Sequence, residues 1–211
     1  MGLISAIAET HTDIDAELVR AWRLFDPQRY AKQVLGKYGI RSELLIRDME
    51  LLPYLTYLDA LTKLRLDVAE AADMTALGGR PTALVSLNVR RRPRAGLRGI
   101  ERWNGLLELG VTFENTVADL RPLAELVSLR KLRIEVVRGI AVKIDLSAVI
   151  GLRNLEEIMV MCDARYELYI GPIIGHSMRR LVVEDYAQIT GESAGLTRAG
   201  VEIVHCEHNA V

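Results

Sequence analysis

The stretch LVSLRKLRIEVV, from Leu126 to Val137, decides the fold. Its apolar residues Leu129, Leu132 and Ile134 are separated first by three positions and then by two. Residues two apart lie on one face of a β-strand, and the residues between them lie on the other face. The stretch therefore predicts a strand that turns Leu132 and Ile134 into a core and leaves its charged residues outside.

The same spacing returns along most of the chain, and the middle residue of each copy follows the previous one by 20 to 26 positions. The middle residues are Leu64, Leu87, Leu109, Leu132, Ile158, Leu181 and Val201. One such strand cannot bury its apolar face alone, whereas copies stacked about 4.8 Å apart build a continuous core. A fixed period of this length predicts a solenoid with a single parallel sheet of about seven strands.

Parallel strands all run in one direction, so the chain must travel back between them. The connecting segment VADLRPLAELVSL carries a leucine at every third position, and Pro122 stands near its start, where a first helical turn tolerates proline. The segments LPYLTYLDALTKL and IDLSAVIGLRNL show similar spacing. We therefore expect return helices between the strands.

The segments LRPLAELVSLRKLRI and LSAVIGLRNLEEIMV resemble the repeat units of bacterial leucine-rich repeat proteins, and the resemblance extends from about Leu51 to Ile203. It implies an α/β leucine-rich-repeat solenoid. In that family an asparagine or cysteine usually follows the last strand leucine by three positions and hydrogen-bonds the turn. Only Cys206 fits this pattern here, so we expect irregular turns.

The two ends of the chain differ from the repeats. Residues 1–40 predict an N-terminal helical cap, and residues 41–211 the repeat array. Asp13 or Asp15 can cap a helix over DIDAELVRAWRLF, and Pro27 can begin a second helix, PQRYAKQVLGKYG. A solenoid needs its first coil covered, so we interpret the pair as a cap; a partner-docking helix is the alternative.

Three further segments suggest strands outside the regular copies. Residues 42–48 carry the strand spacing and predict an extra strand between cap and array. The interval from Leu132 to Ile158 is three residues longer than most, and VVRGIAVKIDLS within it predicts a short inserted strand on the outer side. The closing VEIVHCEHNAV predicts a final edge strand. The polar, glycine-rich YAQITGESAGLTRAG predicts at most a weak helix.

The bulk composition is that of an ordinary soluble protein: half of the 211 residues are apolar and 26% are charged. A net charge of −1 provides no global attraction to nucleic acid or an anionic membrane. Two cysteines do not make a disulfide framework, which favours a reducing compartment. The first residues lack a basic n-region and a long apolar run. We therefore expect no secretory signal, no membrane association and a cytoplasmic location.

Few residues suggest chemistry. His205, Cys206, Glu207 and His208 are adjacent, but a strand turns His208 away from His205, and the sequence offers no third ligand. His11, Asp13 and Asp15 fit a polar helix start better than a metal site. The chain contains no GxSxG, GxxxxGKS or GxGxxG motif. We therefore expect no cofactor, no metal and no catalytic activity.

The segment VRRRPRAGLRGIERW is rich in arginine. It contains Arg90, Arg91, Arg92, Arg94, Arg98 and Arg102. One interpretation is contact with phosphate or an acidic partner, which makes a nucleic-acid-associated regulator the alternative function. Because no exposed aromatic residues are interleaved, we favour a solvated loop followed by a return helix, and nucleic acid is not the expected partner.

The outward residues of the strands form the best candidate binding surface. Its early rows are basic, its middle is mixed, and one row presents two methionines, which adapt well to partner surfaces. Steering charges around an apolar patch are typical of protein recognition. The candidate binding residues are Lys63, Arg65, Asp67, Asn88, Arg90, Glu108, Lys131, Arg133, Glu135, Glu157, Met159, Met161, Arg180 and Glu184.

These observations predict a non-catalytic protein-binding module. The resemblance to compact bacterial repeat proteins further implies an immunity-type inhibitor, which binds and blocks a cognate toxin or enzyme. In that interpretation a subset of the outward residues covers the active surface of the toxin. That subset is Arg65, Arg90, Arg133, Glu135, Met159 and Met161.

Overall fold

The computed structural model describes most of the chain. The described residues are 15–38, 44–67, 74–81, 84, 86–91, 96–115, 117, 119–139, 142–149, 151–163, 165–170, 178–184, 187–191 and 200–206. Among them, no helix has the length and apolar character needed to cross a membrane.

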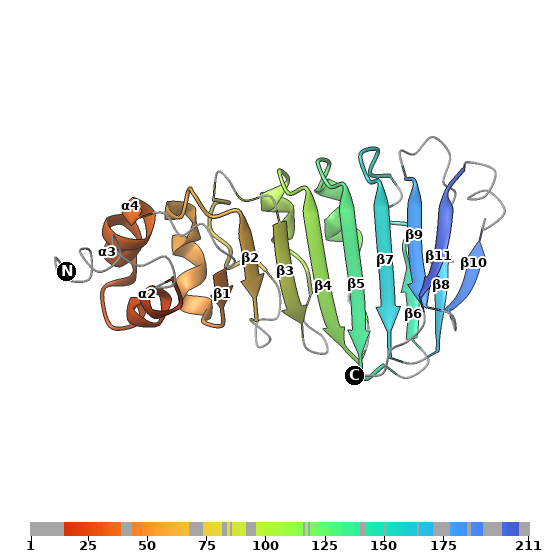
Figure 1. Ribbon diagram of the computed structural model, residues 1–211, viewed down its shortest axis with the longest axis horizontal. Coiled ribbons are helices and arrows are strands. Elements are labelled where there is room, and N and C mark those ends of the chain that lie inside the picture. The colour runs from red at the N-terminus through yellow and green to blue at the C-terminus, as the bar shows by residue number, and fades with distance from the viewer. Residues whose placement is uncertain are drawn as a thin grey trace.

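Eight parallel strands lie side by side in the main sheet, in the order in which they follow along the chain (Figure 1). They are β1 (Leu44–Ile46), β2 (Lys63–Leu66), β3 (Ser86–Arg91), β4 (Glu108–Glu114), β5 (Lys131–Val137), β7 (Glu157–Cys162), β9 (Arg180–Glu184) and β11 (Glu202–Cys206). The predicted middle leucines are register partners from β2 to β5, since Leu64 faces Leu87, Leu87 faces Leu109 and Leu109 faces Leu132. The parallel stack and the extra strand β1 are therefore confirmed.

The last repeat differs from the expected alignment. Ile203, and not Val201, is the register partner of Leu181. The prediction of Val201 as the middle residue was wrong by two positions. A shift of two keeps the same side chains on the inner face, so alternation alone cannot distinguish the two registers.

The return segments of the early repeats consist of 3₁₀ helices and turns, which specifies the type of the expected return helices. They include η2 (Met49–Tyr57), η3 (Ile100–Trp103) and η4 (Arg121–Glu125). Around η4 the N–H groups of Leu123, Leu126 and Leu129 each donate to the carbonyl three residues earlier, at 2.9 to 3.0 Å. A 3₁₀ helix has three residues per turn, so a leucine at every third position lies along one buried edge.

The later return segments contain strands. A second, three-stranded parallel sheet consists of β6 (Val142–Asp145), β8 (Tyr166–Ile170) and β10 (Ala187–Gly191), and it lies behind the main sheet (Figure 1). The inserted strand predicted around Val142 is confirmed as β6. The expectation of a return helix over IDLSAVIGLRNL was wrong, because this segment begins as β6 and continues in turns closed by Val149 and Leu152.

The turns after β4 and β5 share one backbone feature, while the expectation of irregular turns along the whole array stays a prediction. Asn115 and Arg138, after β4 and β5, have positive φ values of 68° and 59°. The carboxylate of Asp163, three residues after Val160 in β7, accepts hydrogen bonds from the N–H groups of Arg138 and Gly139. Asp163 thus serves the preceding turn from the position where the family pattern has asparagine, a role the sequence did not reveal.

Short helices lie at the β1 end of the array (Figure 1). They are α2 (Asp15–Trp22), α3 (Pro27–Tyr30), the π-helical turn η1 (Ala31–Leu35) and α4 (Gly36–Tyr38). Asp26 caps α3 by accepting from the N–H of Arg29 at 2.7 Å, and the buried Trp22 indole donates to the carbonyl of Pro27 at 2.8 Å. The helical pair is present as expected, while the domain boundary at residue 40 stays a prediction and Asp13 lies outside the described residues.

Candidate functional site: the open face of the main sheet

Every second side chain of the main strands lies on the face opposite the return segments, here called the open face. The strand register aligns these side chains into rows. The first row is Lys63, Ser86, Glu108, Lys131, Glu157, Arg180 and Glu202. The second row is Arg65, Asn88, Gly110, Arg133, Met159, Val182 and Val204. The third row is Arg90, Thr112, Glu135 and Met161.

Charges of alternating sign pair with each other in the first row. Lys131 lies 3.5 Å from the carboxylate of Glu108, and Arg180 lies 3.3 Å from Glu157 and 3.7 Å from Glu202. These exposed pairs each contribute little to stability. They nevertheless balance the charge locally, so the electrostatic potential that a partner meets along the first row from β4 to β11 is weak.

The charged side chains of the third row also have partners on the open face. Arg90 reaches Glu114 with its Nη2 at 2.8 Å and its Nε at 3.2 Å. Glu135 lies 3.5 Å from Arg133 and accepts from the hydroxyl of Thr112 at 3.3 Å. Three of the predicted binding residues are therefore already in contact with neighbours on the same face.

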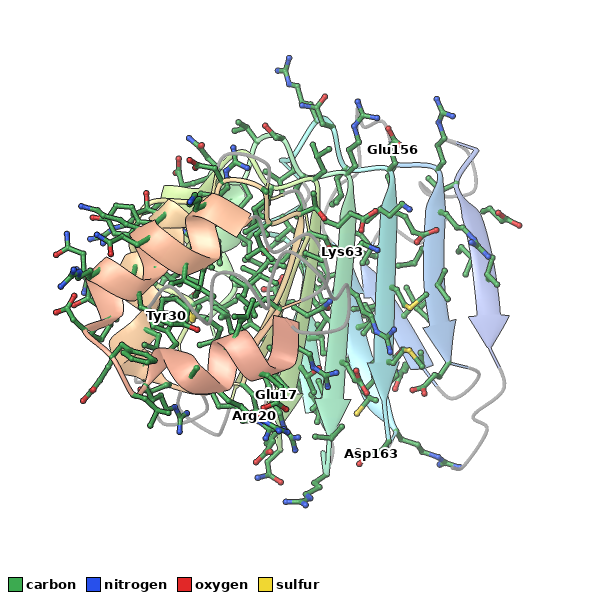
Figure 2. The ribbon with its side chains drawn as sticks, turned by 60° about the vertical axis from the view of Figure 1, so that its left-hand side comes forward. Glu17, Arg20, Tyr30, Lys63, Glu156 and Asp163 are labelled. Carbon is green, nitrogen blue, oxygen red and sulfur yellow. The ribbon has the colours of Figure 1, made fainter. Side chains whose placement is uncertain are left out.

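The two cations of β2 are different. The side chains of Lys63 and Arg65 are exposed, and within the described part of the chain neither forms an ion pair or a hydrogen bond. Figure 2 labels Lys63 on the sheet. Asp67, the acidic residue closest to them in the sequence among the predicted binding residues, instead lies 3.6 Å from Arg47. The β2 end of the open face is consequently a site of uncompensated positive charge.

The second row changes from polar to apolar along the sheet. The amide of Asn88 lies over Gly110, where a Cβ atom would come within 2.0 Å of its Oδ1. Beyond Arg133 the row continues with Met159 and Val182, and Met159 and Met161 are both half-buried. Val182 is buried, with 3% of the residue exposed, despite its place on the open face.

Glu184 does not lie in the predicted surface. Only 2% of the residue is exposed, and its Oε2 accepts a hydrogen bond from the N–H of Cys162 at 2.6 Å. The ladder between β7 and β9 ends at Val160 and Val183, so the Cys162 N–H needs another acceptor. The prediction that Glu184 is an exposed binding residue was therefore wrong.

Most of the side chains that the sequence suggests as metal ligands lie outside the described residues. Among the described residues, no three metal-ligating side chains gather in one place. His205 is an exposed residue of β11, whereas His208, His11 and Asp13 lie outside the described residues. Tyr57 has its pKa lowered, first by a hydrogen bond from Gln28 at 3.0 Å, but it lies in η2 at the cap, away from the open face.

The arginine-rich segment is partly engaged within the protein. Arg90 pairs with Glu114, and Arg102 donates to the carbonyls of Thr75 and Leu77 at 3.1 and 3.4 Å. Arg98 is exposed, while Arg92 and Arg94 lie outside the described residues. At least two of the six arginines are thus in contact with other parts of the protein.

The stacked parallel strands, the spacing of 22 to 26 residues from Leu64 to Ile203 and the buried leucine edges define an α/β leucine-rich-repeat solenoid. No protein-family model and no curated protein matches the chain. Among solved structures, an internalin from Listeria monocytogenes matches with 14% sequence identity and a TM-score of 0.37. The match covers 88% of this chain and 64% of the internalin chain, so this chain spans less than two thirds of that protein.

Proposed function

We propose that the protein is a non-catalytic protein-binding module whose partner contacts the open face. The observation that carries this proposal is the contrast between the β2 cations and the other charges of the face. Lys63 and Arg65 have no partner among the described residues, whereas Lys131 and Arg180 are held by glutamates. A cation without an intramolecular partner attracts an approaching carboxylate more strongly than one that is already paired.

The apolar part of the same face lies four strand steps away from β2. Met159 and Met161 are half-buried on β7, about 19 Å from β2 at the usual strand spacing of about 4.8 Å. Flexible thioether side chains suit a contact that becomes dehydrated on binding. The expected partner therefore carries an acidic patch and an apolar patch separated by roughly the same distance.

The specific form of this proposal is an immunity-type inhibitor acting on a cognate toxin or other enzyme inside the cell. Two features support it: the repeat units resemble those of bacterial leucine-rich repeat proteins, and the face is held on hydrogen-bonded strands that need not reorganise on binding. The partner's active surface would lie across the rows between Arg65 and Met161.

The test begins with affinity capture of the protein in its native host and identification of a stoichiometric partner. Association with that partner is then measured for Lys63→Glu/Arg65→Glu. The control is Arg29→Glu/Arg98→Glu, which changes the net charge equally at exposed positions outside the open face. We expect the first variant to associate at least about tenfold more slowly at low salt and with a weaker salt dependence.

The control should associate at the wild-type rate. Equal rates for both variants would remove β2 from the interface. A larger defect in the Arg29/Arg98 variant would contradict the proposed surface. The immunity form has its own test, because saturating amounts of the protein should abolish the partner's enzymatic activity.

A further inference from the structure

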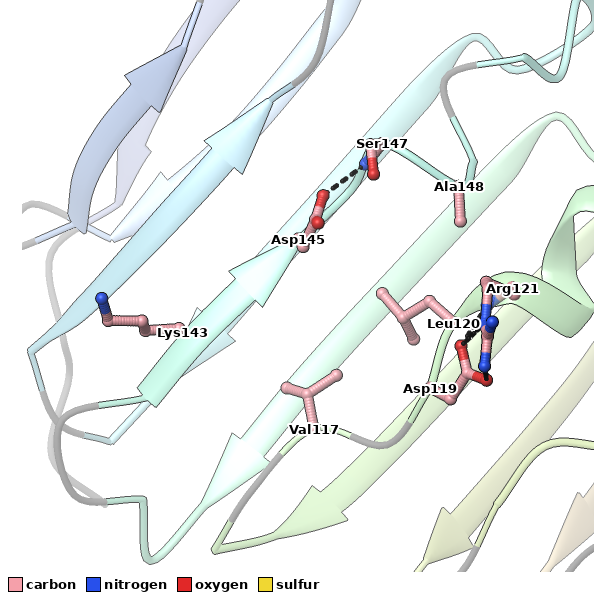
Figure 3. A pocket seen from close by; sticks show the side chains of 8 residues that line it. All are labelled: Val117, Asp119, Leu120, Arg121, Lys143, Asp145, Ser147 and Ala148. Carbon is pink, nitrogen blue, oxygen red and sulfur yellow. Dashed lines mark hydrogen bonds and ion pairs between the residues drawn. The ribbon is translucent and has the colours of Figure 1, made fainter.

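A second candidate binding place lies on the other side of the molecule, between η4 and β6. There a groove of about 440 Å³ separates Val117 and Asp119–Arg121 from β6 (Figure 3). We call it the edge groove, and its lining includes Val117, Leu120, Arg121, Lys143, Asp145 and Ala148. The return segment between β4 and β5 contains η4 and no described strand, whereas the next return segment, between β5 and β7, contains β6. The edge groove lies between these two segments.

One long side of β6 faces this groove. The order of the second sheet is β10-β8-β6, so β6 pairs with β8 on one side only. The N–H of Leu146 donates to the carbonyl of Tyr169 on β8 at 2.9 Å. In a parallel ladder alternate residues direct both backbone groups to the same neighbour. Val142 and Ile144 therefore bond to β8, and the backbone groups of Lys143 and Asp145 point toward the groove.

These edge groups have no partner in the described part of the chain. Among the described residues, no strand pairs with β6 on this side, and no turn or loop hydrogen bond uses the backbone of Lys143 or Asp145. An unpaired strand edge is a template for another strand. Here Val117 and Asp119–Arg121 form the opposite wall of the groove, so the edge of β6 faces other parts of the protein and not open solvent alone.

We propose that the edge groove binds one extended segment of a partner polypeptide, which adds to β6 as a parallel strand. The residue opposite Ile144 would donate its N–H to the Lys143 carbonyl and accept from the Asp145 N–H. Its side chain would point inward, as that of the buried Ile144 does, toward Leu120 and Ala148. A small apolar residue such as valine suits this position.

The charges at the rim specify the neighbouring residues of the segment. On the β8 side Lys143 already pairs with the residue opposite it, Glu167, at 3.2 Å. The Lys143 side chain is 81% exposed and its ammonium group has three N–H donors, so it can also contact an acidic residue on the open side, with a basic residue opposite Asp145. The proposed ligand is thus an extended peptide with the order acidic, small apolar, basic.

The probe is a fluorescent hexapeptide, Thr-Val-Glu-Val-Lys-Val, titrated with the full-length protein in an anisotropy experiment. Saturable binding with a Kd on the order of 100 μM is expected for so short a strand. N-methylation of the central valine removes the donor to the Lys143 carbonyl, and it should weaken binding at least about tenfold. The charge-exchanged peptide Thr-Val-Lys-Val-Glu-Val, which suits an antiparallel strand, should be similarly weaker.

The matched protein variants are Lys143→Ala and Lys143→Pro. Both remove the side-chain charge, but only proline removes the N–H that faces the groove, and edge strands tolerate proline at such a position. We expect the proline variant to bind the hexapeptide several-fold more weakly than the alanine variant, with thermal midpoints within a few degrees of each other. The midpoints show whether both variants are folded.

Three outcomes would overturn the proposal: no saturable binding of the hexapeptide up to about 1 mM, equal binding of the N-methylated peptide, or equal binding of the charge-exchanged peptide. The site is independent of the open face, so loss of partner binding in Lys63→Glu/Arg65→Glu would leave hexapeptide binding unchanged.

Discussion

The hydroxyl group of Tyr166 donates a hydrogen bond to the carbonyl oxygen of Val160 at 3.0 Å, where the ladder between β7 and β9 ends. The same hydroxyl accepts from the N–H of Glu184 at 3.4 Å, and the Glu184 carboxylate accepts from the N–H of Cys162. Two side chains thereby pair backbone groups that a longer ladder would have paired. Because Tyr166 belongs to β8, this contact also ties the second sheet to the main one.

Replacing Tyr166 by phenylalanine should therefore destabilise the protein. The change keeps the ring but removes the donor to Val160 and the acceptor used by Glu184, in a buried environment. We expect the free energy of unfolding to fall by about 1–3 kcal/mol, measured by urea denaturation. Tyr169→Phe is the control, since Tyr169 is 42% exposed and should change stability by less than about 0.5 kcal/mol. Equal effects would show that the hydroxyl contact is unimportant.

A second prediction concerns the acceptor of the Cys162 N–H. Glu184→Ala removes this acceptor, while Glu184→Gln keeps a side-chain oxygen that can occupy the same place. We expect the alanine variant to lose about 1–3 kcal/mol and the glutamine variant clearly less. Urea unfolding at neutral pH measures both. A glutamine variant as unstable as the alanine variant would mean that the retained oxygen does not replace the carboxylate.

The sequence predicted the array well because its signal is repeated. Each inward pair, such as Leu132 and Ile134, obeys the strand period, and the same spacing recurs at a nearly constant interval. A leucine at every third position indicated a return segment, but it fits the three-residue turn of a 3₁₀ helix better than an α-helix. The buried edge and the helical return path were therefore predicted correctly for this segment, while the prediction did not specify the type of helix.

What escaped prediction depends on contacts between distant residues. Alternation placed Glu184 outside, and the end of the β7–β9 ladder, which no local pattern reveals, explains why it lies inside. In β8 the buried residues Tyr166, Leu168 and Ile170 alternate as a strand requires. The sequence of β8 therefore has the strand period, although return helices are the general expectation for the connecting segments.

The open face could be located from the sequence, but the sequence does not show which of its cations lack an intramolecular partner. Lys131, Arg133 and Arg180 were as good candidates as Lys63 and Arg65 on sequence grounds. Only the cross-strand register shows that Lys131 faces Glu108 and that Arg180 lies between two glutamates. The side-chain pairing of parallel strands depends on repeat length, which varies along this chain.

Two glycines should respond differently to the same change. A Cβ at Gly36 would lie 2.5 Å from the backbone carbonyl oxygen of Tyr57, whereas a Cβ at Gly110 would meet the movable amide of Asn88. Alanine normally favours a helix over glycine by about 1 kcal/mol. We nevertheless expect Gly36→Ala to destabilise by about 1–3 kcal/mol, since backbone must move.

Gly110→Ala should cost less than Gly36→Ala, because Asn88 can rotate away from the new methyl group. Urea denaturation of the two variants in parallel provides the comparison. If Gly36→Ala proves as stable as the wild type, the close approach of α4 and η2 would not constrain the cap.

The cap contains a buried hydroxyl group that invites a stabilising substitution. Tyr30 is fully buried between the cap helices (Figure 2), and its hydroxyl has no hydrogen-bond partner among the described residues. Its ring stacks on Phe25 with centroids 5.2 Å apart, a contact that phenylalanine would preserve. We expect Tyr30→Phe to raise the free energy of unfolding by about 1 kcal/mol, because it removes a desolvated polar group.

The same residue predicts a pH effect. Burial raises the pKa of Tyr30 above its ordinary value of about 10. The folded state therefore disfavours ionisation, so this contribution to stability is complete below about pH 10 and is lost as the pH rises through the folded-state pKa. The stability advantage of Tyr30→Phe should grow between about pH 9 and pH 11, measured by urea unfolding. An advantage that does not change with pH would contradict this assignment.

Val182 and Met159 are register partners in one row of the open face. We nevertheless expect substitution of Val182 to change stability and substitution of Met159 to change partner binding. Val182 is 3% exposed, so Val182→Ala should lower the free energy of unfolding by about 1–2 kcal/mol and leave the association rate with the partner unchanged. Met159 is half-buried, so Met159→Ala should cost less stability and raise the dissociation rate several-fold. Binding kinetics with the captured partner and urea unfolding separate the two effects. If Met159→Ala dissociates at the wild-type rate while remaining folded, the apolar half of the proposed interface lies elsewhere.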